Sequence, residues 1–271
     1  MIERFARFPK ALAAVVRPAT LAGVPALLAH PDWKTPAPVM IWMHGRTANK
    51  ELDPGRYLRW IRHGIAAVAL DLPGHGARLD DRGTRAGSTV SVVTEMVGEI
   101  DRVVDALADP AHGDVFDFAR MGVGGMSAGG MAALRRLCEG HDFVCAAVEC
   151  TTGCLQDLYF PPDGGPPPWG VAQEASAVRA IDPSAHLGRW TPIPVLALHS
   201  ETDRIVPVGL QRKFVELLRS RYQRLGAAPD MVELRTWADT GAPDEHSGFG
   251  KFGAQAKDAQ VEFLTRVLKQ G

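Results

Sequence analysis

The chain lacks the features that would indicate a nucleic acid, a membrane or a disulfide framework. Its 30 Lys and Arg residues are balanced by 31 Asp and Glu residues and are interspersed with them, so we expect no binding to nucleic acid. No apolar run is long enough to span a bilayer, and the amino-terminal residues do not resemble a secretory signal. The four cysteines form no Cys-x-x-Cys pair, which favours buried thiols and a cytoplasmic protein without a membrane partner.

What the chain does contain is a serine set between glycines. Ser127 lies in the sequence Gly125-Met126-Ser127-Ala128-Gly129, after a short apolar run and before a helix-forming segment. This pattern is typical of a nucleophile elbow, a strained turn in which the positions two before and two after the serine must be small. Because glycine-rich turns without a function also contain such a serine, the other motifs of the chain must decide between the two interpretations.

Three further segments accompany the serine. Upstream, the apolar run 39–43 ends in His44-Gly45, which is typical of a buried parallel strand that opens into a loop. Downstream, the apolar run 195–198 leads into a loop that carries Asp203. A polar loop that precedes the last predicted helix carries His246. A nucleophile, an acid and a base are therefore all present on predicted loops.

Strand-like and helix-like segments alternate through most of the chain. Apolar residues three and four apart over 90–108 predict a helix with one buried face. The segments 12–17 and 24–30 flank an Ala-Gly turn and predict an antiparallel hairpin at the edge of a sheet. With 271 residues, 46% of them hydrophobic, we predict a single α/β domain over residues 1–271. Its central sheet should be mostly parallel and covered by helices on both faces.

Residues 151–190 interrupt this alternation with a stretch rich in proline and glycine. Loops of this length inside a domain are usually functional or partly disordered. We predict a small lid over Ser127, with a pocket for an acyl or alcohol group lined by Leu158, Tyr159, Phe160 and Trp169. The alternative is a surface excursion that its aromatic side chains hold in place.

Together these motifs resemble those of the α/β-hydrolase superfamily, and more narrowly those of small bacterial serine esterases of the YjfP type and their dienelactone-hydrolase-like relatives. The matching residues are His44-Gly45, the turn Asp71-Leu72-Pro73-Gly74-His75-Gly76, the elbow around Ser127, the pair Phe160-Pro161, and His199 to Asp203 with Val206-Pro207. The order serine, acid, histidine along the chain is that of the superfamily. The resemblance implies an α/β-hydrolase fold and hydrolysis of a small or medium carboxylic ester. Two positions depart from the pattern: Arg46 stands where an aromatic or small residue is more frequent, and Ser200 where a glycine is frequent.

We therefore predict a catalytic triad of Ser127, Asp203 and His246. His246 would take the serine proton, Asp203 would orient the imidazole, and the main-chain N–H groups of Ala128 and Arg46 would form the oxyanion hole. We also expect His44 to lie against the substrate and the guanidinium of Arg46 to contact a substrate carboxylate. The resemblance implies no metal or cofactor, because an activated serine replaces activated water in the first step.

These assignments have alternatives. Other acids lie on nearby loops, and other histidines lie at strand ends or turns where a structural role is common: Glu201, Asp239, Asp244, His44, His75 and His199. A metal site of His44, His75 and Asp71 is a further alternative. A thioesterase, lactonase or peptidase would share the chemistry, and a non-catalytic binding module would share only the fold. The natural substrate and the oligomeric state, monomer or homodimer, stay open.

Overall fold

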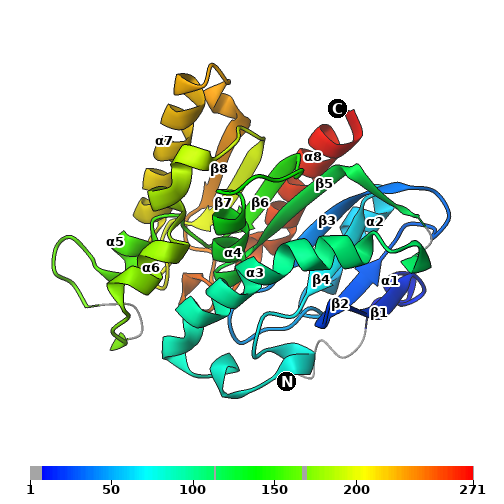
Figure 1. Cartoon of the computed structure of the whole chain (residues 1–271), viewed down its shortest axis with the longest axis horizontal. Helices are drawn as coiled ribbons and strands as arrows, with labels where there is room; N and C mark the ends of the chain where they lie inside the picture. Colours follow the sequence, from blue (N-terminus) through cyan, green and yellow to red (C-terminus); the bar gives the residue numbers. More distant parts are fainter. Residues whose placement is uncertain (1–7, 113, 167–169, 271) are drawn as a thin grey trace.

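An eight-stranded sheet forms the centre of the computed structural model, which describes residues 8–112, 114–166 and 170–270 (Figure 1). The strand order is β1-β2-β4-β3-β5-β6-β7-β8. The pairs β1–β2 and β2–β4 are antiparallel, and all later neighbours are parallel. The strands are β1 (Val16–Leu21), β2 (Val24–Ala29), β3 (Ala37–Met43), β4 (Ala66–Leu70), β5 (Phe116–Met126), β6 (Cys145–Glu149), β7 (Val195–Ser200) and β8 (Val232–Trp237). The prediction of a mostly parallel sheet is confirmed.

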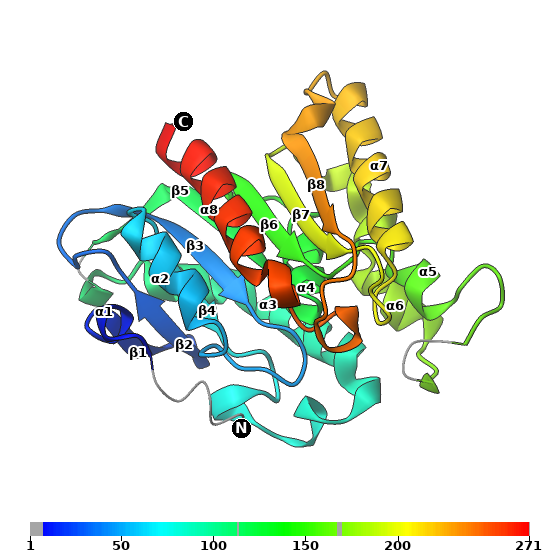
Figure 2. The same ribbon diagram turned by 180° about the vertical axis from the view of Figure 1, so that it is seen from behind.

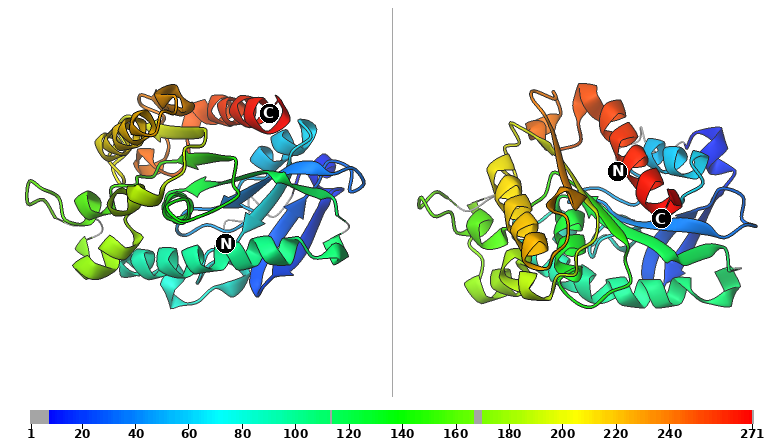
Figure 3. Two further views of the ribbon diagram at one scale, coloured as in Figure 1. Left: turned by 45° about the horizontal axis from the view of Figure 1, so that its top comes forward. Right: turned by 90° about the horizontal axis from the view of Figure 1, so that it is seen from above.

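Helices cover both faces of this sheet, as predicted. The helices are α1 (Lys10–Ala13), α2 (Pro54–Arg62), α3 (Thr89–Leu107), α4 (Ala128–Arg136), α5 (Leu155–Tyr159), α6 (Ala175–Ile181), α7 (Val208–Arg224) and α8 (Gly253–Gln270). Helices α3 and α4 lie in front of the sheet in Figure 1, whereas α2 and α8 lie in front of it in the opposite view of Figure 2. Figure 3 shows the sheet as a layer between α3 and α8.

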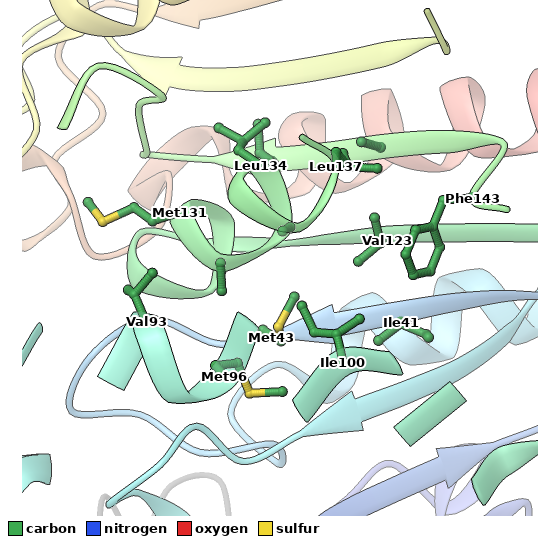
Figure 4. Close-up of a cluster of buried hydrophobic side chains, with 14 of the residues drawn as sticks. Ile41, Met43, Val93, Met96, Ile100, Val123, Met131, Leu134, Leu137 and Phe143 are labelled. Atoms are coloured by element: carbon green, nitrogen blue, oxygen red, sulfur yellow. The ribbon is translucent and has the colours of Figure 1, made fainter. Parts of the chain in front are cut away.

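The alternation of side chains along the strands supplies a separate core to each face. In β3, Ile41 and Met43 pack on the α3 and α4 side, whereas Met40 and Trp42 pack on the α2 and α8 side. Figure 4 shows the first of these cores, where side chains of α3 and α4 meet those of β3 and β5. Because successive strand residues point to opposite faces, strands buried on both faces must be apolar throughout, which explains the continuous apolar runs in the sequence.

Two predicted boundaries differ from the structure. The first strand begins at Val16 and not at Leu12, because Lys10–Ala13 form a short helix, α1, in which Leu12 is buried. The sequence predicts a helix over 131–138 after the elbow, whereas α4 begins at Ala128, because the turn at Ser127 leads directly into the helix. The Ser127 carbonyl accepts the first helical hydrogen bond from the Met131 N–H at 2.9 Å. The predicted hairpin at the sheet edge is confirmed as β1 and β2.

The segment 151–190 contains α5 and α6, and residues 160–166 extend away from the sheet (Figure 1). After the gap in the described residues, the chain returns to the body of the protein, where the Gln173 side chain donates to the Gly87 carbonyl at 3.0 Å. The lid itself stays a prediction. Over the described ranges, none of the helices combines the length and the apolar character that crossing a membrane would require.

Candidate active site

Ser127 occupies a strained turn between β5 and α4. Its φ of 50° and ψ of −118° lie in a region of backbone conformation that residues other than glycine rarely adopt. Its N–H donates to the Glu149 carbonyl at 2.8 Å, which fixes the turn to the end of β6. A Cβ atom at Gly129 would lie 2.3 Å from the Met43 carbonyl oxygen, and one at Gly125 would lie 2.5 Å from the Gly129 carbonyl carbon. Close packing of neighbouring chains therefore requires both glycines, as the elbow pattern predicts.

The structure brings the three predicted triad residues together, although they come from separate loops. The Ser127 Oγ lies 2.9 Å from the His246 Nε2, and the His246 Nδ1 lies 2.8 Å from the Asp203 Oδ2. All three residues are buried. Because the carboxylate can only accept from Nδ1–H, Nε2 is left to accept the serine hydroxyl proton. The arrangement can therefore move a proton from the serine to the histidine.

The loop after β7 holds the Asp203 carboxylate firmly. Its Oδ1 accepts from the Ile205 and Val206 N–H groups, both at 2.8 Å. The His199 Nε2 lies 3.3 Å from Oδ2 and donates to the Val206 carbonyl at 2.8 Å. Burial would raise the pKa of Asp203, but hydrogen bonds from His199 and His246 lower it below its usual value. The acid is therefore ionised and oriented. His199 has a structural role, which is common for a histidine at the end of a strand.

A second carboxylate, that of Glu245, organises the loop that carries His246. Its Oε2 accepts from the Ser200 Oγ at 2.8 Å and from the Thr240 N–H and Oγ1, each at 2.7 Å. Its Oε1 accepts from the Gly241 N–H at 2.7 Å. The hydrogen bonds from Thr240, Ser200 and Gly241 together lower the pKa of Glu245 to about 2. This carboxylate joins the end of β7 to the histidine loop.

Two main-chain N–H groups beside the serine fit the predicted oxyanion hole. Ala128 is the first residue of α4, where the helix leaves an N–H without an acceptor and a partial positive charge. A Cβ at Gly45 would lie 3.4 Å from the Ser127 Cβ, so the loop after β3 also lies beside the serine. The N–H groups of Ala128 and Arg46 donate no hydrogen bond to any residue in the described part of the chain. Both remain available to a developing oxyanion.

Arg46 lines the cavity beside Ser127, and its guanidinium is bonded to protein groups. Its Nη1 donates to the Thr89 Oγ1 at 2.9 Å, and its Nη2 donates to the carbonyls of Arg82 and Arg85, each at 2.8 Å. A guanidinium whose terminal nitrogens are bonded in this way joins the oxyanion loop to the segment before α3. The contact of Arg46 with a substrate carboxylate stays a prediction.

His44 lines the cavity, yet both of its ring nitrogens are already bonded. Its Nδ1 donates to the Gly45 carbonyl at 2.6 Å, and its Nε2 accepts from the Leu72 N–H at 3.1 Å. Burial lowers the pKa of His44 to about 4, so the ring is neutral at pH 7. Because the carbonyl and the N–H of one peptide unit point in opposite directions, the bond to Gly45 orients the Arg46 N–H. These contacts favour a supporting role over a direct contact with substrate.

The side chains of His44, His75 and Asp71, the alternative metal site, form hydrogen bonds with other protein groups. The His75 Nδ1 donates to the Pro73 carbonyl at 2.8 Å. The Asp71 carboxylate accepts from the Lys50 ammonium and from the Ala77 N–H, each at 2.8 Å. A carboxylate neutralised by lysine and imidazoles bonded to the main chain are features of a packed turn.

Cys150, Asp203 and His246 place potential metal-ligating atoms within 4.8 Å of one another. A metal ion bound there would have to replace the proton that joins Asp203 to His246, because those two groups are only 2.8 Å apart. The same cluster thus serves proton transfer in its present geometry, and binding a metal would disrupt it.

A cavity of about 580 Å³ opens at Ser127 and His246. Its apolar wall consists of Trp42, Leu52, Tyr57, Met126, Ile205 and Phe249. A buried ion pair contributes to the rest of the wall: Arg56 donates to both carboxylate oxygens of Glu149, at 2.6 and 2.7 Å. This volume lies in the range of pockets that hold small organic ligands.

The predicted lid residues do not form the wall of this cavity. In the described part of the chain, Leu158 and Tyr159 pack into the core on the α3 and α4 side, and Phe160 is exposed. The reason is the short helix α5, in which Leu155, Leu158 and Tyr159 share one buried face. Trp169, the fourth of the predicted lid residues, lies outside the described residues.

Sequence patterns do not predict the Arg56–Glu149 pair or the role of Glu245. Both depend on contacts between residues that are distant in sequence, 93 positions apart for the pair and 45 positions apart for Ser200 and Glu245. The departure from glycine at Ser200 is the signal that could have directed attention to Glu245.

Comparisons with known proteins find a similar sequence and similar folds. No family model matches the chain. The chain is 27% identical over 199 residues to a protein named Esterase YjfP from Escherichia coli (strain K12), which covers 69% of this chain and 78% of that protein. Solved structures show the same fold at lower identity.

TT1662 from Thermus thermophilus superposes with a TM-score of 0.72 at 20% identity, covering 94% of this chain and 98% of that one. A puromycin-hydrolyzing peptidase from Mycobacterium tuberculosis gives a TM-score of 0.71 at 20% identity, covering 96% of this chain and 40% of that one. Esterase Est2 from Thermogutta terrifontis, solved with propionate bound, gives a TM-score of 0.63 at 17% identity, covering 96% of this chain and 96% of that one. The sheet order, the elbow and these likenesses show that the chain has the fold of the α/β-hydrolase superfamily.

Proposed function

We propose that the chain is a serine hydrolase that cleaves small or medium carboxylic esters through an acyl-enzyme on Ser127. The observation that carries the proposal is the continuous hydrogen-bonded path from the Ser127 Oγ through His246 to Asp203, with distances of 2.9 and 2.8 Å. The similarity to a protein named an esterase supports the same reaction class.

The geometry accounts for each step of the reaction. The Ser127 Oγ attacks the ester carbonyl carbon while the His246 Nε2 takes its proton, and the tetrahedral oxyanion accepts from the Ala128 and Arg46 N–H groups. The imidazolium, stabilised by Asp203, then gives the proton to the departing alcohol and leaves an acyl-enzyme. Water then attacks the carbonyl carbon of the acyl-enzyme while His246 takes its proton. His246 returns this proton to the Ser127 Oγ as the carboxylic acid leaves.

The cavity indicates the size of the substrate. Its volume of about 580 Å³ and the aromatic side chains of Trp42, Tyr57 and Phe249 favour a substrate of modest size with an apolar portion. Four free cysteines, all buried, support the proposed location in the cytoplasm, where thiols stay reduced.

A peptidase is the second candidate, because a structural neighbour is named a puromycin-hydrolyzing peptidase. Amide and ester hydrolysis share the acyl-enzyme, so the same triad would serve both. Thioester and lactone cleavage also stay open for this reason. A non-catalytic binding module would not require the hydrogen-bonded alignment of three side chains from separate loops.

The test is hydrolysis of p-nitrophenyl esters of increasing acyl length by the wild type and by Ser127→Ala. We expect the variant to lose at least about 10³-fold in kcat, because no nucleophile remains. The wild type should prefer short and medium acyl chains that the cavity can hold. Equal rates in the two proteins would refute the proposal, and cleavage of aminoacyl amides in place of esters would favour the peptidase.

A further inference from the structure

The loop that carries His246 contains a cluster of strained backbone positions. Asp239, Asp244 and Glu245 have φ values of 52°, 51° and 53°, in the left-handed region that residues other than glycine rarely adopt. Each such position raises the energy of the loop by about 1–3 kcal/mol unless its surroundings over-determine it. The loop therefore needs specific contacts to keep its conformation, and with it the position of the imidazole.

The Glu245 side chain supplies these contacts. Four donors converge on its two carboxylate oxygens at 2.7 to 2.8 Å, and Glu245 is only 7% exposed. Three of the donors belong to Thr240 and Gly241, so they close the loop on itself. The fourth, the Ser200 hydroxyl, belongs to the last residue of β7, three positions before Asp203.

We propose that Glu245 is a positioning residue that fixes the histidine loop to the acid loop and so keeps His246 aligned with Ser127 and Asp203. This inference rests on the proposed function, since it concerns the geometry of the same triad. It also assigns a role to Ser200: a glycine at this position could not donate the bond that joins the two loops. Glu245 touches no reacting atom and acts only through His246, its neighbour in the chain.

Two substitutions separate the bond between the loops from the fold of the histidine loop. Ser200→Ala removes one donor and leaves the three bonds from Thr240 and Gly241 in place. Glu245→Gln preserves the shape but turns one of the two acceptor oxygens into an N–H₂ donor. This group would face either the three donors at the Oε2 position or the Gly241 N–H at the Oε1 position. Asp239→Asn is the matched control, because it neutralises an exposed carboxylate in the same loop and asparagine tolerates a positive φ.

The experiment measures kcat and KM for p-nitrophenyl acetate, and in parallel the rate at which a fluorophosphonate labels Ser127, after thermal unfolding has shown that each variant is folded. We expect kcat and the labelling rate to fall about 10-fold in Ser200→Ala and about 100-fold in Glu245→Gln, since small misplacements of reacting groups have effects of this size. KM should stay within about 2-fold, because the cavity wall is unchanged. Asp239→Asn should behave as the wild type.

Folded Ser200→Ala and Glu245→Gln variants with unchanged kcat and labelling rate would overturn the proposal. A loss of the same size in Asp239→Asn would overturn it as well, because the effect would then belong to the charge of the loop. If Glu245→Gln fails to fold, Ser200→Ala alone decides. If the wild type is labelled but hydrolyses no ester, the proposed substrate class fails, while the labelling rates still decide the role of Glu245.

Discussion

Replacing Gly129 by alanine is the change that most directly tests the packing of the elbow. Gly129 is the second residue of α4, and a Cβ there would lie 2.3 Å from the Met43 carbonyl oxygen and 2.6 Å from that of His44. Both oxygens belong to the main chain that leads from β3 into the oxyanion loop. Neither can move aside as a flexible side chain would, so the helix and the strand end must separate.

The size of the effect follows from this distance. Increasing the contact from 2.3 Å to about 3 Å requires a displacement of about 0.7 Å, and it moves the Ala128 and Arg46 N–H groups apart. Overpacking of this kind destabilises a folded protein by about 1–3 kcal/mol, and misplacements approaching 1 Å reduce rates by up to about 100-fold. We therefore expect Gly129→Ala to lower the free energy of unfolding by about 1–3 kcal/mol. The same variant should have a kcat for p-nitrophenyl acetate that is about 10-fold to 100-fold lower.

Gly98→Ala is the matched control for this substitution. Gly98 is exposed within α3, and a Cβ there meets no other atom within 4 Å. Because alanine is the better helix former, this variant should gain about 0.5–1 kcal/mol in the free energy of unfolding and keep the wild-type kcat. Urea unfolding and steady-state kinetics measure both quantities. A Gly129→Ala protein that matches Gly98→Ala in kcat and stability would show that the elbow is not packed as described.

Two further predictions concern the charges of the site. Asp203→Asn should fold yet lose about 10⁴-fold in kcat, because an amide cannot hold the His246 Nδ1–H as the carboxylate does; a loss below about 10-fold would remove Asp203 from the triad. Stability should fall as the pH drops below 6.5, because His44 has a pKa of about 4 in the folded protein and of about 6.5 when unfolded, so the unfolded chain binds the extra proton. This difference lowers the free energy of unfolding by about 1.6 kcal/mol between pH 6.5 and 5. A flat profile in urea unfolding over this range would contradict the neutral, buried imidazole.

The features that the sequence predicts well are those that local chemistry determines. The elbow at Ser127 needs small neighbours within two residues on either side, so a short pattern is sufficient to find it. The strands are apolar because both of their faces are buried, and this shows without knowledge of their partners. Asp203 and His246 follow from their positions after a strand and in a late polar loop, and the geometry joins them to the serine.

Sequence patterns are least informative for side chains with more than one environment open to them. Tyr159 and Leu158 are apolar and lie in an unusual segment, which is compatible with a substrate pocket, yet one turn of helix directs them into the core. The Arg46 guanidinium suits a substrate carboxylate equally well in principle. Its bonds to the carbonyls of Arg82 and Arg85, about 40 positions away, could not be deduced from the order of residues.

The four buried cysteines can report local unfolding of the core. Cys138, Cys145, Cys150 and Cys154 are all buried and form no disulfide. Burial raises the pKa of Cys138, Cys145 and Cys154 to about 12, and it raises the pKa of Cys150 well above its usual value. Alkylating reagents attack thiolates that they can reach, so the folded chain should be inert to them. Alkylation of any one cysteine then reports that its part of the core has opened, and the time course measures the free energy of that opening. Because Cys150 lies beside Asp203 and His246, inactivation by a maleimide would time the opening of the catalytic centre itself.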